Sequence, residues 1–147
     1  MRFMLLVKAT GYTEAGVDHS PEYSDARIAY KRALDMSGVL LANEELQPSW
    51  AGMRIGYSSY GSEPKVQAGP FPANQQLIAE YALIDVRTEG EALGWALRMP
   101  IPEGLGGFEI ELRRVEDRSD DSQDPRVLAM KEDLQNQLSM LRGNPKL

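Results

Sequence analysis

The most constraining feature of this sequence is a pair of segments, residues 2–8 and 77–86, that are apolar on both faces of a β-strand. In the first segment, apolar side chains follow one another without a break from Phe3 to Val7. Strands with this pattern lie in the centre of a sheet and are covered on both sides. The chain must therefore bury both faces of one sheet, and a single layer of helices covers only one of them.

The other segments alternate between helix and strand patterns. Ser20-Pro21-Glu22 combines an N-cap hydroxyl with a proline in the first turn, which predicts a helix over residues 21–37. Thr88 and Glu91 form a capping box that predicts a second helix over residues 89–99. Further strands are expected at residues 39–46, 53–57, 65–68 and 108–113, the second and third of them joined as a hairpin. The predicted order is β-α-β-β-β-β-α-β.

Both helices are expected to pack on the sheet through an apolar stripe with three- and four-residue spacing. The stripes consist of Tyr23, Ala26, Tyr30, Ala33 and Leu34 in the first helix, and of Ala92, Leu93, Ala96 and Leu97 in the second. Two β-α-β units with right-handed crossovers place both helices on one face of a mainly antiparallel sheet, which is the α+β, ferredoxin-like arrangement. The opposite face is left open, and an open apolar face indicates an interface, here with a second copy of the chain.

A change in composition divides the chain after this domain, which is predicted over residues 1–115. Residues 116–124 hold five acidic residues, one basic residue and no apolar residue, and are expected to form an acidic linker. A C-terminal amphipathic helix is predicted over residues 125–142. Its stripe consists of Val127, Met130, Leu134, Leu138 and Leu141. This extra helix competes with a second copy as the cover of the open sheet face.

Composition excludes several classes of function. The formal net charge of −6 disfavours nucleic acid as a partner. With no cysteine and one histidine, the chain cannot form a thiolate zinc site or an iron–sulfur cluster, and neither a metal nor a cofactor is expected. No apolar run approaches the roughly 18 residues of a membrane span, and no cleavage site follows the first residues, so a cytoplasmic protein without a membrane partner is expected.

Several motifs, taken in order, resemble the YCII-related family and specifically its DGPF branch. They include the opening strand Met1–Val7, the tetrapeptide Ala68-Gly69-Pro70-Phe71 and the strand Tyr81–Val86. The similarity covers about residues 1–115. It implies a dimeric α/β-barrel of ferredoxin-like subunits, in a superfamily that includes small-molecule isomerases and monooxygenases, and a largely unassigned activity for this branch.

Two departures from the family pattern bear on function. Ala68 replaces the aspartate of the DGPF signature, so any acid–base role of that carboxylate is missing here. Other members are thought to pair an aspartate with a histidine of the first helix, whereas the only histidine here is His19, in the loop before that helix.

Three residues are candidates for acid–base chemistry. Asp85 ends an otherwise apolar strand and shares a pleat face with Tyr81, so it could be a desolvated carboxylate; the alternative is a polar strand end. Glu44 could pair with Asp85 on a carbonyl or lactone substrate, against the alternative of a solvated edge charge. His19 follows Asp18 and could act as a general base, or lie exposed in its loop.

Ligand-binding candidates lie around the hairpin and on the strand after it. Arg54 and Tyr57 could hold an anionic ligand through a guanidinium and a hydroxyl. The alternative is that they form the solvent-exposed face of the hairpin. The full set of ligand-binding candidates is Gly69, Pro70, Phe71, Tyr81, Arg54 and Tyr57.

Three functions remain open from the sequence. The first is a dimeric, cofactor-free small-molecule enzyme with isomerase- or lyase-like acid–base chemistry. The second is a dimer that binds or senses a small molecule without catalysis, which the loss of the signature aspartate favours. The third is an assembly module that acts through its C-terminal helix.

Overall fold

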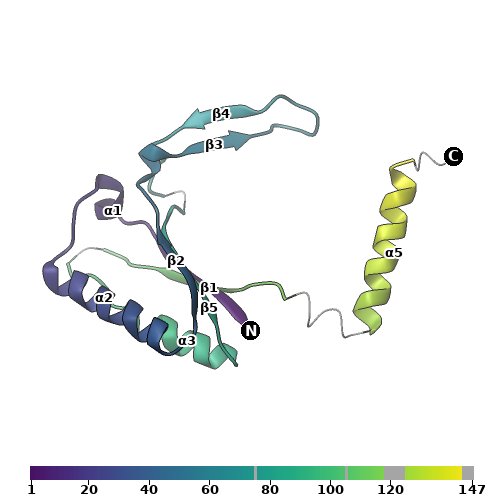
Figure 1. Ribbon diagram of the computed structural model, residues 1–147. Coiled ribbons are helices and arrows are strands. Elements are labelled where there is room, and N and C mark those ends of the chain that lie inside the picture. The colour runs from purple at the N-terminus through teal and green to yellow at the C-terminus, as the bar shows by residue number, and fades with distance from the viewer. Residues whose placement is uncertain (75, 105, 118–124, 144–147) are drawn as a thin grey trace. The chain divides into compact units, whose positions relative to one another are not determined.

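The computed structural model describes residues 1–74, 76–104, 106–117 and 125–143. Its contacts divide the chain into two units, Met1–Val115 and Glu116–Leu147. The elements of the first unit are β1 (Arg2–Lys8), α1 (Gly11–Ala15), α2 (Pro21–Met36), β2 (Leu40–Glu45), the 3-10 turn η1 (Ser49–Ala51), β3 (Met53–Gly56), β4 (Lys65–Ala68), β5 (Ile78–Asp85), α3 (Glu89–Leu97) and β6 (Ile110–Arg114), and the second unit contains α5 (Pro125–Leu141) (Figure 1).

The first unit is a mixed α+β structure built on a four-stranded antiparallel sheet. Its strand order is β2-β5-β1-β6, and every neighbouring pair is antiparallel. The order, with the crossover helices α2 and α3, is compatible with the predicted ferredoxin-like arrangement. The predicted strands are all present, but β3 and β4 pair only with each other and form a separate two-stranded ribbon.

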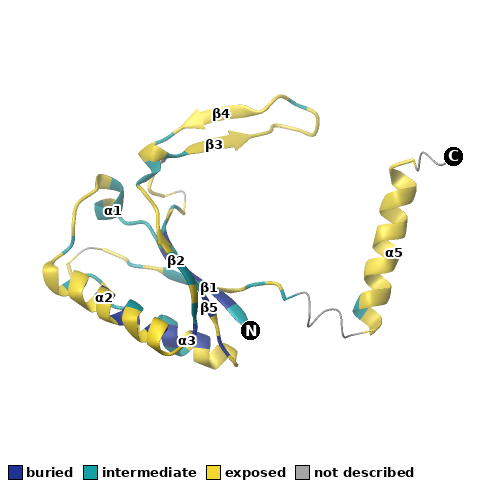
Figure 2. Ribbon diagram, viewed as in Figure 1, coloured by how far each residue is buried: buried dark blue, intermediate teal, exposed yellow. Residues whose placement is uncertain are grey.

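The core lies on one face of the sheet, where α2 and α3 pack (Figures 1 and 2). Alternate residues of the two central strands are buried against these helices, and Leu5 and Ile84 are completely so. The residues between them, such as Met4 and Leu83, point to the other face and are only partly buried. No helix of this unit covers that second face in the part of the chain that the structure describes, so we call it the open face.

The buried stripe of α2 differs from the predicted one. Arg27, Tyr30 and Leu34 are buried, whereas Ala26 and Ala33 are exposed. The stripe shifts because the Arg27 side chain reaches a carboxylate on the sheet, described below, and so replaces an apolar residue. The Tyr30 hydroxyl donates to the carbonyl of Trp95 in α3, and burial raises the pKa of Tyr30 to about 12.

The predicted stripe of α3 is also partly wrong. Leu93 and Leu97 are exposed, and the helix packs on the core through Ala92 and Trp95. The wide indole ring sets the rotation of this nine-residue helix, and the Arg98 guanidinium lies over it at 3.7 Å from the ring centroid.

A further correction concerns the segment before α2, since the sequence signals no helix between the first strand and residue 21. Residues 11–15 instead form the short helix α1, whose capping box joins Thr10 and Thr13 in both directions. Gly16 then ends the helix in the left-handed region, at φ 69°.

The ribbon of β3 and β4 is anchored at its base by a set of contacts around Ser49, which we call the Ser49 knot. The backbone N–H and hydroxyl of Ser49 both donate to the carboxylate of Glu14 in α1, and the same hydroxyl accepts from the N–H of Phe71. Gly69, which precedes a cis peptide bond to Pro70, donates its N–H to Gly52. The knot therefore joins three segments that are far apart in sequence.

The second unit contributes the helix that was predicted over residues 125–142. None of the described residues of α5 is buried, and its apolar stripe is exposed apart from Val127, which is partly buried. Residues 118–124, most of the predicted acidic linker, lie outside the described residues. Among the described helices, none combines the length and the apolar character that crossing a bilayer requires.

The first testable prediction concerns Gly69. A Cβ at this position would lie 1.8 Å from the Ser49 carbonyl oxygen, so Gly69→Ala must displace backbone and open the Ser49 knot. We expect a loss of about 1–3 kcal/mol in the free energy of unfolding in urea, with faster hydrogen exchange at β3 and β4. Gly56→Ala is the control, because a Cβ there meets nothing within 4 Å. Equal free energies of unfolding and equal exchange rates in the two variants would contradict the close contact between Gly69 and Ser49.

Candidate functional site

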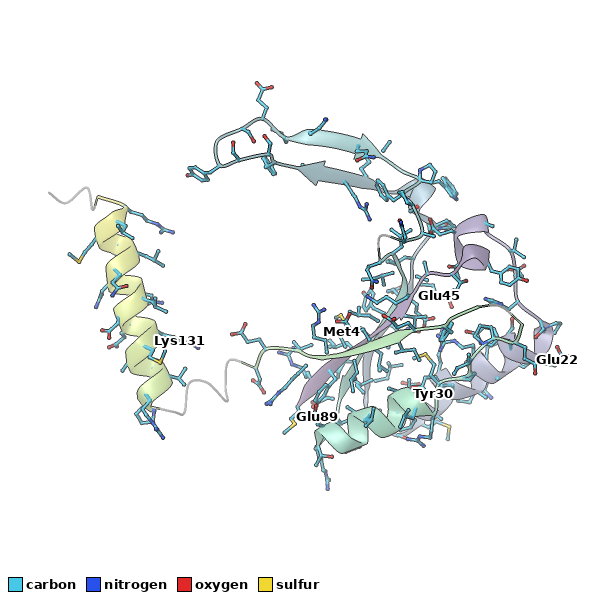
Figure 3. All side chains as sticks on the ribbon, turned by 180° about the vertical axis from the view of Figure 1, so that it is seen from behind. Met4, Glu22, Tyr30, Glu45, Glu89 and Lys131 are labelled. Atoms are coloured by element: carbon cyan, nitrogen blue, oxygen red, sulfur yellow. The ribbon has the colours of Figure 1, made fainter. Side chains whose placement is uncertain are left out.

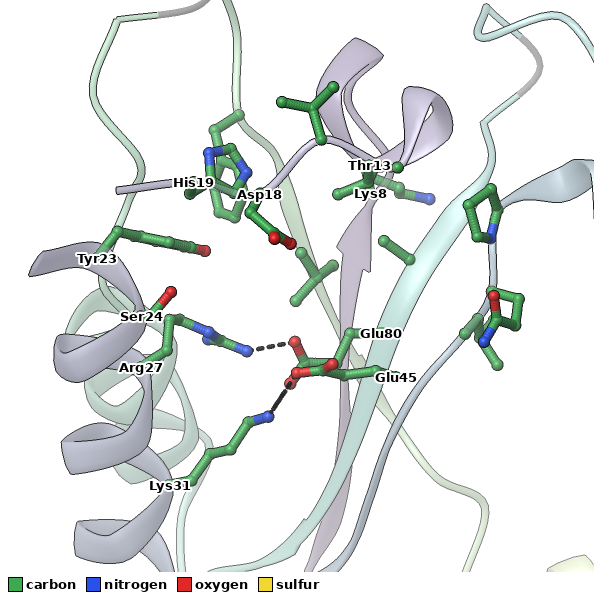
Figure 4. Close-up of a pocket in the computed structure, with 18 of the residues that line it drawn as sticks. Lys8, Thr13, Asp18, His19, Tyr23, Ser24, Arg27, Lys31, Glu45 and Glu80 are labelled. Carbon is green, nitrogen blue, oxygen red and sulfur yellow. Dashed lines mark hydrogen bonds and ion pairs between the residues drawn. The ribbon is translucent and has the colours of Figure 1, made fainter. Parts of the chain in front are cut away.

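The candidate site is a cleft of about 690 Å³ at one end of the interface between α2 and the sheet (Figure 4). Its walls come from several segments of the first unit: the end of β1, α1 with the loop after it, residues 23–31 of α2, the end of β2 with the chain that leaves it, the start of β5, and Phe108 before β6. The cleft lies on the helix-covered side of the sheet, because its floor residues Val7 and Glu80 belong to the buried faces of their strands.

Glu80 is the centre of a charged network on the cleft floor. It is buried on β5, and its carboxylate pairs with the guanidinium of Arg27 from α2. It also accepts a hydrogen bond of 2.9 Å from Asn43 Nδ2 of β2, and Lys31 Nζ lies 3.7 Å from it. A buried carboxylate needs this number of donors, because its desolvation would otherwise be too costly. Figure 4 shows Arg27 and Lys31 reaching from α2 toward Glu80.

The Arg27 guanidinium has more donors than this network uses. Its Nη2 pairs with Glu80, whereas Nη1 is buried and has no hydrogen-bond partner among the described residues. A buried donor without an acceptor costs about 1–3 kcal/mol. Because Arg27 lines the cleft, an oxygen atom of a bound molecule could supply that acceptor after a small adjustment of the side chain.

A second set of polar groups lies around Tyr23, one turn before Arg27 on the same helix α2 (Figure 4). The imidazole of His19 lies between two tyrosine rings, with centroids 5.3 Å from Tyr12 and 4.8 Å from Tyr23. Asp18 and Tyr23 point toward the cleft (Figure 4), and burial raises the pKa of the Tyr23 hydroxyl. At neutral pH Tyr23 therefore stays protonated and can donate a hydrogen bond to a ligand.

Lys31 links the cleft floor to its rim. Its ammonium donates to Glu45 Oε1 at 2.9 Å, and this hydrogen bond lowers the pKa of the Glu45 carboxyl. Glu45 therefore remains ionised, and its charge balances that of Lys31 rather than that of a ligand.

The lining of the cleft determines what it can take. Its charged side chains are the bases Arg27 and Lys31 and the acids Asp18, Glu45 and Glu80; Lys8 also lines it, but its ammonium pairs with Glu111. His19 and Tyr23 are further ionisable groups of the lining. Because the positive and negative charges nearly balance, the cleft does not require a highly charged ligand. Apolar side chains, including Val17, Ile28 and Phe108, complete the walls. A small organic molecule with an apolar body and an oxygen acceptor fits this lining. No cluster of three metal-ligating side chains occurs among the described residues.

The predicted acid–base residues are not brought together. His19 lines the cleft, but Asp85 and Glu44 lie on the open face of the sheet, with Tyr81. Glu44 is paired with Tyr81, four residues from Asp85, which corresponds to roughly 13 Å along the strand. The Asp85 side chain is 54% exposed and forms an ion pair of 3.3 Å with the Met1 amine. The predicted pair of Glu44 with Asp85 is therefore not formed, and Glu45 rather than Glu44 reaches the cleft.

The predicted ligand-binding residues lie outside the cleft as well. Gly69, Pro70 and Phe71 are at the base of the ribbon, where Phe71 is buried and the Arg54 guanidinium lies 4.0 Å above its ring centroid. Tyr57 follows β3 and is exposed. In this position Gly69-Pro70-Phe71 anchors the ribbon, and binding of a ligand by these residues stays a prediction.

Sequence reasoning missed Arg27, Lys31 and Glu80. Two signals were available. Arg27 interrupts the apolar stripe of the first predicted helix, and Glu80 lies in the middle of a strand whose other charged residue, Asp85, stands at its end. Two opposite charges at positions expected to be buried indicate a buried ion pair, since neither charge is stable there alone.

Comparison of the sequence with protein-family models and with curated proteins found no match. This result neither supports nor contradicts the resemblance to the YCII-related family, which stays a prediction.

The second testable prediction concerns the buried ion pair. Arg27→Met leaves the Glu80 carboxylate with fewer donors, and we expect it to lower the free energy of unfolding by about 3 kcal/mol. Arg32→Met, on the exposed face of the same helix, should change it by less than about 0.5 kcal/mol. The double variant Arg27→Met, Glu80→Gln should lose less than the sum of its single changes, since the two groups interact directly. Urea unfolding gives the free energy of unfolding of Arg27→Met, Glu80→Gln, the double variant and Arg32→Met. A loss in the double variant equal to the sum of the two single losses would contradict a direct interaction between Arg27 and Glu80.

Proposed function

We propose that the chain is a YCII/DGPF-like protein that binds a small organic molecule, through a carboxylate or carbonyl oxygen, in the cleft between α2 and the sheet. The observation that carries this proposal is Nη1 of Arg27, a buried donor without a partner among the described residues, on a side chain that lines a cleft of about 690 Å³. An oxygen acceptor bound there removes the cost of the unpaired donor, so ligand binding and the buried charge network reinforce each other.

A second candidate function is acid–base catalysis in the same cleft. The observation in its favour is that the cleft lined by Arg27 is also lined by His19 and Asp18, from the loop before α2, and by Tyr23, one turn before Arg27 on α2. Arg27 would hold the carbonyl oxygen of the substrate, and the imidazole of His19 would accept a proton from the neighbouring carbon and return it elsewhere. An isomerase- or lyase-like reaction of this kind needs no cofactor.

The third testable prediction is a binding experiment on the full chain. Phenylacetate, phenylacetamide and phenethylamine share an apolar ring, but only the first two carry an oxygen acceptor. We expect calorimetry to detect binding of the first two and not of phenethylamine. Arg27→Lys keeps a cation beside Glu80 but removes the forked donors, so we expect at least tenfold weaker binding.

Arg32→Lys, the same replacement on the exposed face of α2, is the matched control and should bind like the unchanged chain. Binding of phenethylamine as strong as that of phenylacetate, or equal affinities for the two Arg→Lys variants, would reject the proposed role of Arg27.

A separate experiment distinguishes the two candidate functions. A carbonyl compound is incubated with the chain in heavy water and recovered, and its nuclear magnetic resonance spectrum is recorded. Exchange of its α-hydrogen that is lost in His19→Gln supports catalysis, and an unchanged compound supports binding alone.

We also propose that two chains form a homodimer through their open faces, giving the α/β-barrel arrangement. The open face has an apolar centre, formed by alternate residues of β1 and β5 such as Met4, Leu6 and Leu83. Charged residues surround it, among them Glu111, which forms an ion pair with Lys8 at 3.2 Å. An apolar centre inside a charged rim is the usual anatomy of a protein interface.

The fourth testable prediction concerns this dimer. Leu83→Lys places a charge in the centre of the open face, and we expect the chain to become monomeric at concentrations where the unchanged chain is dimeric. Leu93→Lys is the matched control, because Leu93 is an exposed leucine on α3. Light scattering after size-exclusion chromatography gives the mass of each. A monomeric unchanged chain, or a dimeric Leu83→Lys variant, would reject the open face as the interface.

A further inference from the structure

The contacts of Glu80 divide its two carboxylate oxygens between different donors. One oxygen pairs with Nη2 of Arg27, and the other accepts from Asn43 Nδ2 at 2.9 Å and lies 3.7 Å from Lys31 Nζ. Asn43 is itself held in place, because the same nitrogen donates to the carbonyl of Tyr81 at 2.8 Å. Glu80 therefore does not satisfy Nη1 of Arg27, which is left for another acceptor.

The two bases of α2 that line the cleft are each paired with an acid of the sheet. Glu80 neutralises Arg27, and Glu45 Oε1 lies 2.9 Å from the ammonium of Lys31. Glu45 is the last residue of β2 and stands at the end of the sheet beside α1 (Figure 3). Arg27 therefore offers a ligand a hydrogen bond, but its positive charge is already balanced.

The remaining acid makes the lining of the cleft negative. Lys8 lines the cleft as well, but it forms an ion pair with Glu111 of β6. With His19 neutral, the other charged side chains are two bases and three acids. The acid that the two bases do not balance is Asp18, which points toward the cleft (Figure 4). The cleft therefore has an excess of one negative charge.

The hydroxyl of Tyr23 responds to the same surroundings. Burial is the main cause that raises its pKa, Glu80 and Glu45 raise the pKa further, and the charge of Arg27 lowers it. A raised pKa means that a negative charge on the phenol oxygen is disfavoured at this place. A ligand anion in the cleft meets the same loss of water and the same carboxylates.

These observations separate three classes of ligand. An anion supplies an acceptor to Nη1, but it shares one guanidinium with the Glu80 carboxylate, and two like charges held that close repel each other. A cation suits the charge of the cleft but supplies no acceptor, so the buried donor stays unpaired. An uncharged carbonyl group supplies the acceptor without adding a second negative charge.

We propose that the cleft selects an uncharged carbonyl compound, such as an amide, a ketone or an ester, over a carboxylate of the same shape. The proposal rests on the proposed function, because it names the class of ligand whose oxygen Arg27 binds. Glu80 and Asp18 are then the residues that determine specificity. Glu80 neutralises the guanidinium that would otherwise attract an anion, and Asp18 repels one.

The experiment compares phenylacetamide with phenylacetate, which have nearly the same shape and differ by one charge at neutral pH. Calorimetry on the full chain gives both dissociation constants, and we expect the amide to bind roughly tenfold more tightly. Because this selectivity is a ratio of two constants measured on one protein, an error in the concentration of folded chain does not change it.

Asp18→Asn removes the acid in excess, and it should reduce the selectivity about threefold by strengthening the binding of phenylacetate. Asp35→Asn is the matched control and should keep the selectivity, because Asp35 is exposed on α2 and does not line the cleft. Phenylacetate binding as tightly as the amide, or a selectivity unchanged in Asp18→Asn, would overturn this inference while leaving binding through Arg27 standing. Binding of neither compound would overturn the proposed function and the inference together.

Discussion

The first unit depends on a sheet that its helices cover on one face only. Leu5 and Ile84 are sealed beneath α2 and α3, whereas the alternate residues of the same strands receive no helix from this unit. Because side chains of a strand alternate strictly between its two faces, a chain cannot make such strands apolar throughout without a use for both faces. The composition of the central strands therefore calls for a second layer, and this need motivates the proposed dimer.

The cleft arises where charge interrupts the apolar layer between α2 and the sheet. Glu80 on β5 and Arg27 on α2 occupy positions that would otherwise be filled by hydrocarbon, and each is tolerable only because of the other. Polar contacts hold the two layers together at this end, while Tyr30 and Leu34 pack in the ordinary way further along the helix. The chemistry of the site is therefore a consequence of how one end of the core is built.

The sequence predicted the elements of the fold well because they depend on local signals. Alternation defined the strands, and Ser20, Thr88 and the flanking prolines marked the helix ends. The orientation of α2 and α3 was harder to predict, since it depends on partners such as Glu80 for Arg27, which are distant in sequence. His19 was placed in a loop that does line the cleft, but the separation of Glu44 and Asp85 follows from register and could not be read from spacing. Helix α1 was missed because a five-residue helix leaves almost no periodicity.

The Ser49 knot has a mechanical consequence. Pro48 and Gln47, the two residues before Ser49, are part of the cleft wall, and Thr13, next to Glu14, is part of it too. The ribbon begins only a few residues later. A displacement of the ribbon therefore shifts Ser49 and, with it, the neighbouring residues of the cleft wall, unless the hydrogen bonds between Ser49 and Glu14 break. The contacts of Ser49 therefore connect the base of the hairpin directly to the wall of the cleft.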